Sequence, residues 1–382
     1  MHLVVFTHSV VSDWNHGNAH FLRGVLRALQ TRGHTTETFE PSDGWSLQNL
    51  LGDHGLPAVQ DFAAHFPDLP PKFYDPTYER FDGEPLEAVL DRADAVLMHE
   101  WNHPAFVARL GRHRTARGPG GGGSGGGAGF VLLFHDTHHR AATAPGEMAR
   151  FDLSAYDGVL AFGEVISNIY RREGWHDRVW TWHEAADATV FTPAPLPVET
   201  QRDLVWVGNW GDGERTAELG QFLLGPVREL GLSARVHGVR YPAEAREALR
   251  VAGAEYAGWL PNHRVPRAFA EARVTVHVPR GPYVAKLPGI PTIRPFEALA
   301  CGLPLVCSPW DDAEGLFTPG RDYLTAADGA EMKTQLRRVL DDETLAADLA
   351  ERGRETVLAR HTCGHRADEL LNVLAELNTG DL

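Results

Sequence analysis

The chain has 382 residues, of which 43% are hydrophobic and 23% charged, and its formal net charge at pH 7 is −15. These values are typical of a soluble globular protein with room for two domains. Because no surplus of basic residues is available to neutralise phosphates, the charge excludes a general nucleic-acid binder and docking on anionic membranes through a broad basic patch.

The N-terminus and the cysteines favour the cytosol. Residues 1–6 lack a cationic leader and are typical of a first strand rather than of a signal peptide. No apolar stretch reaches the length of a membrane span. Cys301, Cys307 and Cys363 are odd in number and lack CxxC spacing, which fits a reducing compartment. We therefore expect a cytoplasmic protein.

The first half of the chain alternates buried strands with helices. Residues 2–7 form a continuous apolar run, and after a polar loop a helix opens at residues 17–20 and is expected to end at Gly33. A strand at 35–39 completes a unit typical of the mononucleotide-binding half of a doubly wound sheet. Further strands are predicted at 95–98, 130–134, 158–162 and 179–182, with helices near 106–110 and at 165–172.

Two segments carry little pattern. Residues 40–90 are rich in proline, and we interpret them as a loop with short helices. Residues 118–129 read GPGGGGSGGGAG, which indicates a flexible surface loop within one domain rather than a boundary between domains.

The second half repeats the alternation. A strand at 203–207 runs into the glycine-rich loop 208–213, and a helix follows through residues 219–223. Later strands are predicted at 235–237, near 256, at 274–278 and at 305–307, and helices at 330–340, 343–360 and 363–377.

Glu297 is the one charged residue of a short apolar helix that ends at Gly302. We expect this helix to begin at Glu297, where the helix dipole stabilises a carboxylate at a position that faces the ligand crevice of an open α/β sheet. The alternative is that Glu297 only caps its helix.

Residues 297–306, EALACGLPLV, resemble the second half of the donor-binding motif of the group 1 GT-B glycosyltransferases, which use nucleotide-diphosphate sugars. The resemblance covers nearly the whole chain, including a linker-like segment at 183–197 and a base-stacking element at 258–266. It implies an α/β GT-B fold with two Rossmann-like, doubly wound parallel-sheet domains that face each other across a cleft. We expect an acceptor-side domain at 1–190, a nucleotide-sugar-binding domain at 191–362, and a helix at 363–382 that crosses back to the first domain.

The resemblance also implies roles for individual residues. Glu297 would bind the ribose hydroxyls, and His135 would lie against the donor sugar, with Asp136 orienting the imidazole or capping the next helix. The first glutamate of the family motif falls at Gly289, a departure that is similar to the divergent CgeB-like branch. We expect the backbone N–H groups of Gly289, Ile290 and Thr292, with the Arg294 side chain, to take its place. Retention of anomeric configuration is implied as well.

The diphosphate of the donor requires positive charge or oriented N–H groups. The loop 208–213 follows a strand and opens a helix, so it is a candidate anion nest. Asn209 stands where many members of the family have arginine, and we expect the charge to come from elsewhere. A surface ion pair worth about 0–1 kcal/mol is the alternative for each arginine. The remaining donor-side candidates are Gly208, Arg215, Arg240, Arg294, Thr292, Ile293, Trp259, Leu260, Gly17 and Asn18.

Polar residues at the ends of predicted strands mark the first domain. His8, His99 and His135 each follow a strand, so they are expected to share one edge of the sheet. The spacing of His135 with His138 and His139 permits zinc, but no partner residue is visible and the family generally works without a metal, so we expect none. Candidates for a general base in an inverting reaction, on the acceptor side with Trp101 and Asn102, are Asp13 and Glu100.

These observations predict a glycosyltransferase of the hexosyltransferase class, EC 2.4, that needs no cofactor. It would move a sugar from a nucleotide-diphosphate sugar, with a UDP-sugar favoured, to a glycan, a lipid-linked sugar or a small molecule. No nucleic-acid partner and no transmembrane segment are expected. The alternatives are a nucleotide-sugar epimerase or hydrolase on the same fold, and a non-catalytic sugar-nucleotide-binding module, consistent with Gly289. A Rossmann-type oxidoreductase ranks last because the first turn lacks G-x-G-x-x-G.

Overall fold

The computed structural model describes residues 1–15, 17–117, 129–195 and 202–379. The chain divides into two compact units. The first unit comprises Met1–His183 and Cys363–Leu382, and the second comprises Glu184–Thr362. The division thus falls at residue 183 rather than at 190. Most of the glycine-rich loop predicted at 118–129 lies outside the described residues.

The first unit contains a nine-stranded sheet in the order β5-β4-β3-β2-β1-β6-β7-β8-β9. Its strands from β3 through β1 to β9 run parallel, and only the pairs β3–β4 and β4–β5 are antiparallel. The central strands are continuous apolar runs because helices cover the sheet. The strands are β1 (His2–Phe6), β2 (Thr35–Pro41), β3 (Lys72–Tyr74), β4 (Arg80–Phe81), β5 (Glu84–Pro85), β6 (Ala95–His99), β7 (Val131–Asp136), β8 (Gly158–Ala161) and β9 (Val179–Thr181).

The segment 40–90 is more regular than its sequence indicates. It holds three helices and the short strands β3, β4 and β5, which extend the sheet at one end. Strands of two or three residues are too short to show an alternation of apolar and polar side chains, so the sequence pattern missed them. The helices of the first unit are α1 (Asn18–Thr31), α2 (Trp45–His54), α3 (Leu56–His65), α4 (Leu86–Asp91), α5 (Pro104–Arg117), α6 (Arg140–Thr143), α7 (Pro145–Met148), α8 (Glu164–Arg172) and α17 (Cys363–Thr379).

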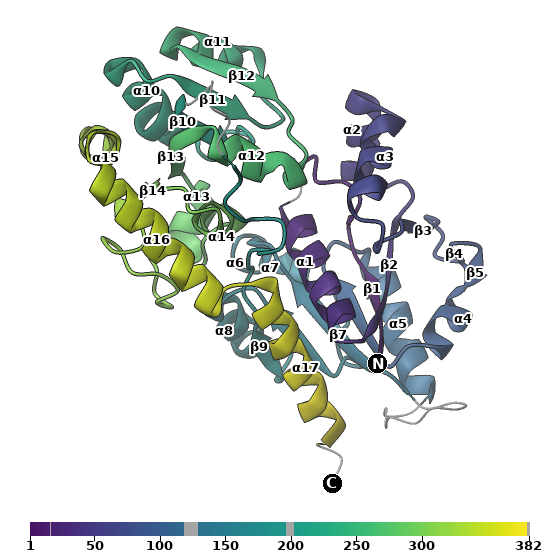
Figure 1. The fold of residues 1–382 in the computed structure, drawn as a ribbon. Coiled ribbons are helices and arrows are strands. Elements are labelled where there is room, and N and C mark those ends of the chain that lie inside the picture. The colour runs from purple at the N-terminus through teal and green to yellow at the C-terminus, as the bar shows by residue number, and fades with distance from the viewer. Residues whose placement is uncertain (16, 118–128, 196–201, 380–382) are drawn as a thin grey trace. The chain divides into compact units, whose positions relative to one another are not determined.

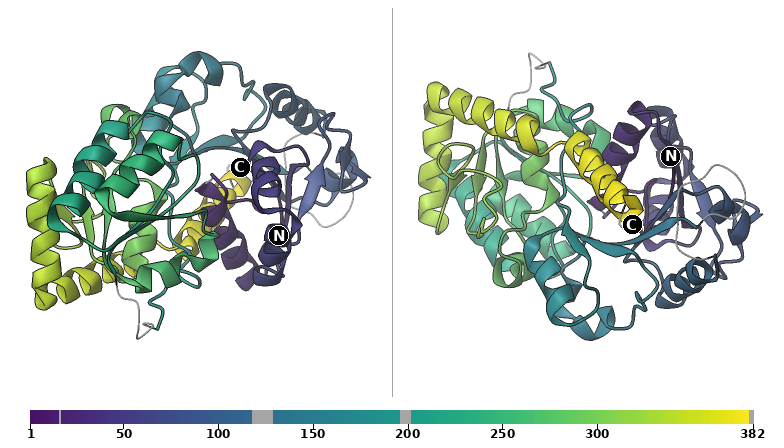
Figure 2. Two further views of the ribbon diagram at one scale, coloured as in Figure 1. Left: turned by 90° about the horizontal axis from the view of Figure 1, so that it is seen from above. Right: turned by 90° about the horizontal axis from the view of Figure 1, so that it is seen from below.

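Helix α17, at the far end of the chain, packs against α1 (Figures 1 and 2). Asp368 of α17 forms an ion pair with Arg32, with 2.7 Å between Oδ1 and Nε. The indole N–H of Trp182 donates to the carbonyl oxygen of Arg366 at 2.9 Å. The last helix therefore belongs to the first unit.

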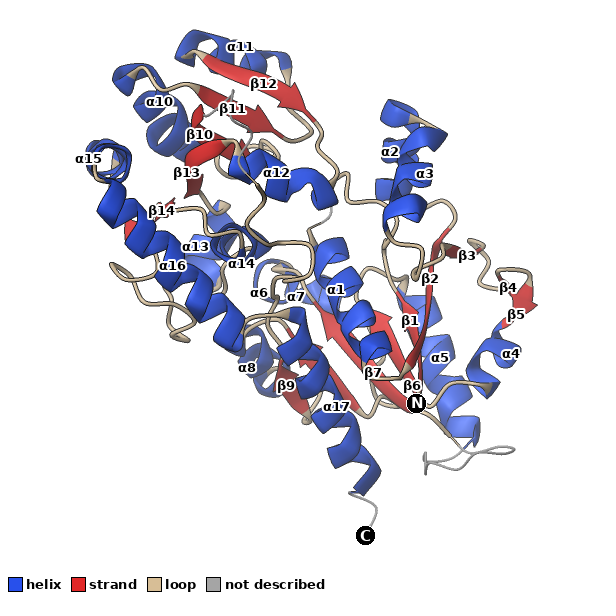
Figure 3. Cartoon of the chain, in the orientation of Figure 1, coloured by secondary structure: helices blue, strands red, loops and turns tan. Residues whose placement is uncertain are grey.

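The second unit contains six parallel strands in the order β12-β11-β10-β13-β14-β15 (Figure 3). Alternate residues of β10 enter two separate apolar clusters: Leu204 and Trp206 pack in one, Val205 and Val207 in the other. Both faces of the sheet are thus covered, which explains the unbroken apolar run. The strands are β10 (Arg202–Val207), β11 (Ala234–His237), β12 (Ala254–Gly258), β13 (Ala272–His277), β14 (Leu305–Cys307) and β15 (Leu324–Thr325).

The second unit's helices connect these strands. A π-helical turn (Gly220–Leu224) joins α9 to α10, and a 3-10 turn (Asn262–Arg264) precedes α12. The helices are α9 (Thr216–Leu219), α10 (Gly225–Leu230), α11 (Ala243–Ala252), α12 (Val265–Ala270), α13 (Gly281–Lys286), α14 (Ile293–Ala300), α15 (Gly329–Asp341) and α16 (Glu343–Arg360).

Each sheet has a point where its strand order reverses. The chain goes from β1 to β2 on one side and returns to β6 on the other, and likewise from β10 to β11 and back to β13. In open α/β sheets, ligands bind in the crevice that such a reversal leaves at the carboxyl ends of the strands. A ligand site is therefore expected among the residues that follow β1, β6, β10 and β13.

Candidate functional site

The loop after β10 is held in place by a buried arginine. The Arg215 side chain, 7% exposed as a residue, donates to the carbonyl oxygens of Val278 at 2.8 Å and of Asn209 at 2.6 Å. Its guanidinium also lies 5.1 Å from the centre of the Trp206 ring. Gly208 is required here, because a Cβ at this position would approach the Trp206 ring to 2.9 Å. The loop is thus a packed turn at the reversal point, with Arg215 beneath it.

Two further arginines surround Arg215, and we call Arg215, Arg280 and Arg294 the basic cluster. Burial, followed by the charges of Arg280 and Arg294, lowers the pKa of Arg215 to about 10. The amide oxygen of Asn209 accepts from Arg215 at 2.9 Å and from Arg280 at 3.1 Å. A neutral amide here holds two guanidinium groups without cancelling their charge.

The carboxylates near the basic cluster balance only part of it. Arg280 pairs with Glu214 at 3.2 Å, and Arg294 pairs with Glu297. Arg215 forms no ion pair with any residue that the structure describes. A buried cation that lacks a counter-ion favours an anionic ligand beside it.

Glu297 lies in the middle of α14 and not at its start. The helix begins at Ile293 with Thr292 as its N-cap, so the expectation that Glu297 opens the helix is wrong. Pro295 falls within the first turn, where its missing N–H costs no hydrogen bond, and the sequence pattern therefore does not show the helix start. The positive end of the helix dipole therefore faces the space before Ile293 and does not act on Glu297.

The Glu297 carboxylate is almost fully buried and is held from two sides. Its side chain is 1% exposed. Oε1 accepts from the Asn262 amide at 3.1 Å, and Oε2 pairs with Arg294, whose side chain is 16% exposed. These two contacts fix the orientation of the carboxylate.

A neutral histidine caps this edge of the sheet. His277 ends β13, and its Nε2 lies 3.2 Å from the Thr292 hydroxyl. Burial, with the charges of Arg215 and Arg294, lowers the pKa of His277 to about 3. The buried Ile293 follows Thr292 and packs the start of α14.

The other donor-side candidates of the second unit are one arginine in an exposed ion pair and two half-buried residues. Arg240 forms an ion pair with Asp212 at 3.0 Å, and both side chains are 38% exposed. Trp259 and Leu260 are half-buried just before the 3-10 turn that carries Asn262. Arg280, Asn262 and His277 were not selected from the sequence. His277 ends the buried strand β13 and Arg280 follows it, which is a signal that could have found these two residues.

In the first unit, His99 and His135 come together as expected. Strands β6 and β7 pair in parallel with these two residues in register, and their ring centroids are 5.3 Å apart. His135 is fully buried against Trp182, and its ring nitrogens lack a hydrogen-bond partner within the described part of the chain. Burial lowers the pKa of His135 to about 3, so the imidazole is neutral. A contact with a sugar would require the side chains around His135 to move.

Asp136 does not orient the His135 ring. It accepts from the Tyr170 hydroxyl at 2.8 Å and from the backbone N–H of His138 at 3.1 Å. Burial raises the pKa of Asp136 to about 6. Asp136 therefore holds the loop that precedes α6.

The loop after β1 is organised by a second buried arginine. Asp13 forms an ion pair with Arg23 at 2.9 Å, and both side chains are buried. Asp13 is thus part of the loop's support, which makes it a poor base. Gly17 is the N-cap of α1, and the Asn18 amide oxygen lies 3.1 Å from Nε2 of His99.

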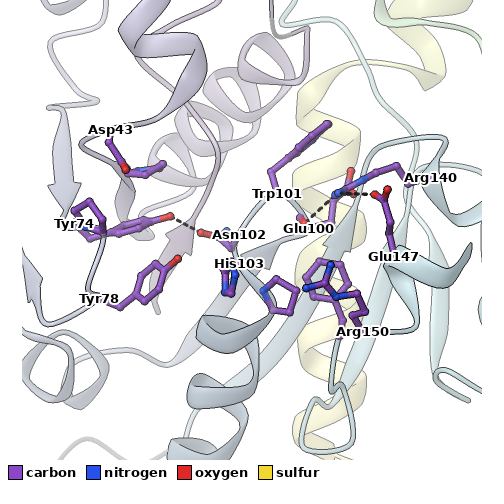
Figure 4. Close-up of a pocket in the computed structure, with 14 residues that line it drawn as sticks. Asp43, Tyr74, Tyr78, Glu100, Trp101, Asn102, His103, Arg140, Glu147 and Arg150 are labelled. Atoms are coloured by element: carbon purple, nitrogen blue, oxygen red, sulfur yellow. Dashed lines mark hydrogen bonds and ion pairs between the residues drawn. The ribbon is translucent and has the colours of Figure 1, made fainter. Parts of the chain in front are cut away.

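A polar cavity of about 320 Å³ opens at the carboxyl ends of β2, β3 and β6 (Figure 4). Trp101 is 38% exposed, and the centre of its ring lies 4.4 Å from Cζ of Arg140. Arg140 pairs with Glu100 and, at 3.8 Å, with Glu147. The cavity is further lined by Pro41, Asp43, Tyr74, Pro76, Tyr78, Asn102, His103, Pro104, Arg150 and Phe151.

Glu100 is the buried acid of this cavity. Burial and the nearby Asp136 raise the pKa of Glu100 to about 8, while Arg140 opposes this shift. His8 lies near the same ring, 5.6 Å from Trp101 between centroids, and burial lowers its pKa to about 4. The arrangement joins an exposed aromatic face, a cation and an acid that titrates near neutrality.

Two general properties concern the described residues only. No group of three or more His, Cys, Asp or Glu side chains among them is arranged to hold a metal ion. None of their helices combines the length and hydrophobicity that crossing a membrane requires.

Comparison with known proteins identifies the fold. A family model described as glycosyl transferase-like matches residues 215–372, which include the whole basic cluster and Glu297. No curated protein matches the chain in sequence. Among solved structures, the chain is similar to sucrose-phosphate synthase from Thermosynechococcus elongatus, with a TM-score of 0.63 and 14% identity over 100% of both chains.

Two more solved structures show the same likeness. A glycosyltransferase from Rickettsia africae matches with a TM-score of 0.66 and 10% identity over 100% of this chain and 99% of its own. HepE from Anabaena, in complex with UDP-glucose, matches with a TM-score of 0.65 and 13% identity over 98% of this chain and 100% of its own. The predicted GT-B fold of two parallel-sheet α/β domains is confirmed.

Proposed function

We propose that this chain is a glycosyltransferase of the hexosyltransferase class that uses a UDP-sugar as donor. The observation that carries the proposal is the basic cluster at the reversal point of the second sheet, where Arg215 is buried beside Arg280 and Arg294 and forms no ion pair with the residues that the structure describes. A dianionic or trianionic diphosphate is the ligand that would offset this charge. The UDP-glucose complex of HepE supports the choice of a UDP-sugar.

The diphosphate is proposed to bind between the basic cluster and the N-terminus of α14. The first N–H groups of a helix have no partner within the helix, and the Thr292 side chain does not cap them. His277 is neutral at this edge and can donate or accept one directed hydrogen bond. Charge that develops on the leaving diphosphate would meet fixed donors that need no reorganisation.

The nucleoside is proposed to lie along the segment that carries Trp259 and Asn262. Asn262 and Arg294 orient the Glu297 carboxylate, which would accept hydrogen bonds from the ribose hydroxyls. The half-buried Trp259 ring stands three residues before Asn262 and is the candidate for stacking on the base.

The acceptor is proposed to bind in the cavity that contains Trp101. An exposed indole with Arg140 above it suits a sugar ring with several hydroxyl groups. In the reaction, the bond between C1 of the donor sugar and the diphosphate oxygen breaks, C1 bonds to the acceptor oxygen, and the acceptor hydroxyl loses its proton. We expect retention of configuration, as the resemblance to the group 1 enzymes implies, and the further placement near their CgeB-like branch stays a prediction. An inverted product would instead require a base, and Glu100 is the buried carboxyl that lines this cavity.

A ligand screen followed by product analysis tests the proposal. Thermal shift with UDP, GDP, UDP-glucose, UDP-galactose and UDP-N-acetylglucosamine should show stabilisation by about 2.7 kcal/mol at a hundred times the dissociation constant. Arg280→Ala should weaken UDP binding by roughly ten- to a hundredfold, since a hydrogen bond to a charged group contributes about 1.5–3 kcal/mol. Arg267→Ala is the matched control because its side chain is 80% exposed on α12.

The outcomes separate the alternatives. Transfer of sugar to an added acceptor supports the proposal, and NMR of the product gives the anomeric configuration. Rearranged or hydrolysed donor without acceptor would indicate an epimerase or hydrolase. Tight binding without any turnover would indicate a binding module, and absence of nucleotide binding would refute the proposal.

A further inference from the structure

The side chain of Glu314 occupies the space that a side chain at position 289 would need. A Cβ built on Gly289 would lie 2.6 Å from Cγ, 2.7 Å from Oε1 and 3.0 Å from Cδ of Glu314. Gly289 also has a φ of +88°, which L side chains rarely adopt. The contact exists only because residue 289 is glycine.

The two loops that form this contact follow neighbouring strands. β13 and β14 pair in parallel, and both loops leave the sheet at their carboxyl ends. The backbone N–H of Gly289 donates to the carbonyl oxygen of Asp311 at 2.6 Å, which ties the loops together. Gly289 lies three residues before Thr292, the N-cap of α14. Glu314 is therefore presented on the edge of the sheet that carries the basic cluster.

We propose that the Glu314 carboxylate binds hydroxyl groups of the transferred sugar and so supplies the acid that Gly289 cannot. This inference rests on the proposed function, since it concerns the same donor. The carboxyl carbon of a glutamate at 289 would lie about 2.5 Å from its own Cβ, given bond lengths of about 1.5 Å. Cδ of Glu314 lies 3.0 Å from that same point, so its carboxylate lies beside the position from which a side chain at 289 would extend.

The carboxylate of the neighbouring Asp312 has a different role. The Asp312 carboxylate accepts from the backbone N–H groups of Leu316 at 2.9 Å and Phe317 at 2.8 Å, so it is used to fold the loop. Glu314 is half-buried, and its side chain occupies the space that a Cβ on Gly289 would need. A carboxylate is a strong acceptor for the paired hydroxyls of a sugar ring.

The test compares a donor with its sugar-free counterpart. The donor is whichever of UDP-glucose, UDP-galactose and UDP-N-acetylglucosamine binds the wild-type chain most tightly, and UDP is the counterpart. For Glu314→Ala and Glu314→Gln we expect at least a tenfold loss of affinity for the UDP-sugar and less than a twofold change for UDP, measured by isothermal titration calorimetry. The matched control is Glu351→Gln, an exposed carboxylate on α16.

A second variant reaches the same contact from the other loop. Gly289→Ala places a Cβ where Glu314 now lies, so the carboxylate must shift and the same selective loss should follow. The isosteric Glu314→Gln keeps the packing on Gly289 and remains informative even if Glu314→Ala does not fold.

The two proposals fail in different ways. If the wild-type chain binds neither UDP nor any of the UDP-sugars, the proposed function is refuted. If it binds both, and the Glu314 variants fold and keep their UDP-sugar affinity, the inference about Glu314 is wrong while the proposed function stands. Equal losses for UDP and UDP-sugar would also overturn the inference, because the carboxylate would then act on the nucleotide or on the fold.

Discussion

Replacing Glu297 by glutamine tests the binding of the nucleoside separately from the binding of the diphosphate. The variant keeps the shape of the side chain but removes its charge and one of its two acceptor oxygens. A hydrogen bond to a charged group contributes about 1.5–3 kcal/mol, and 1.4 kcal/mol is a factor of ten in affinity. We therefore expect UDP to bind roughly ten- to a hundredfold more weakly to Glu297→Gln.

The same change should leave pyrophosphate binding intact or strengthen it. Glu297 is the carboxylate that pairs with Arg294, so its neutralisation raises the net positive charge of the basic cluster. Ribose hydroxyls are absent from pyrophosphate, and the contacts with Arg215 and Arg280 remain. The two ligands should thus respond in opposite directions.

Calorimetric titration of both ligands into wild-type and variant protein measures the effect. Loss of a buried ion pair should lower the free energy of unfolding by about 1–3 kcal/mol, so circular dichroism must first show that the variant is folded at the assay temperature. Unchanged UDP affinity in a folded variant would refute the ribose-binding role of Glu297. Parallel losses for UDP and pyrophosphate would show that Glu297 acts on the whole site.

Three further predictions concern stability and the acceptor. Gly238→Ala should lower the free energy of unfolding, measured by denaturant titration, by about 4 kcal/mol or more, because its Cβ would lie 2.0 Å from the Gly208 carbonyl oxygen. Gly220→Ala is the control and should have little effect, because no atom lies within 4 Å of the Cβ that it would add. Burial raises the pKa of Glu40 to about 7 from 4.5, so the stabilisation by its protonated form is complete below pH 4.5 and is lost as the pH rises through 7. Between pH 4.5 and 9 the free energy of unfolding of Glu40→Gln should therefore rise, relative to that of the wild-type chain, by up to about 3 kcal/mol. An identical pH dependence of the two proteins would contradict this. Trp101→Ala should raise the KM for the acceptor by about tenfold while UDP affinity stays constant, and a matching loss of UDP affinity would disprove its assignment to the acceptor.

Much of the fold could be read from local patterns. The apolar runs at β1, β7 and β10 are unbroken because helices cover both faces of their sheets, and this pattern directly predicts parallel strands. The very short strands β3 to β5 escaped prediction, since two or three residues hold no period. The start of α14 was misplaced because Thr292 and Pro295 are both compatible with a loop or with a helix N-terminus.

The site was predictable only in part. Glu297, Arg215 and Arg294 were selected from motif and position, and the structure brings them to one edge of the second sheet. Arg280 was missed because its position nine residues before Gly289 gives no sign that its charge lies beside Arg215. Asp136 was expected to orient the His135 ring or to cap the next helix, and its oxygens instead accept from the Tyr170 hydroxyl and the His138 backbone N–H.

The sequence alone determined the features that repeat over a few residues: buried strands, helix faces, the glycine-ended turns and the EALACGLPLV motif that indicates a nucleotide-sugar enzyme. Only the tertiary structure decided which distant side chains meet. Asn262 reaches Glu297, and Glu314 fills the space above Gly289, through contacts that depend on strand order and loop path. Local periodicity is set by bond geometry along the chain, whereas such contacts arise from packing between loops that no short window of sequence contains.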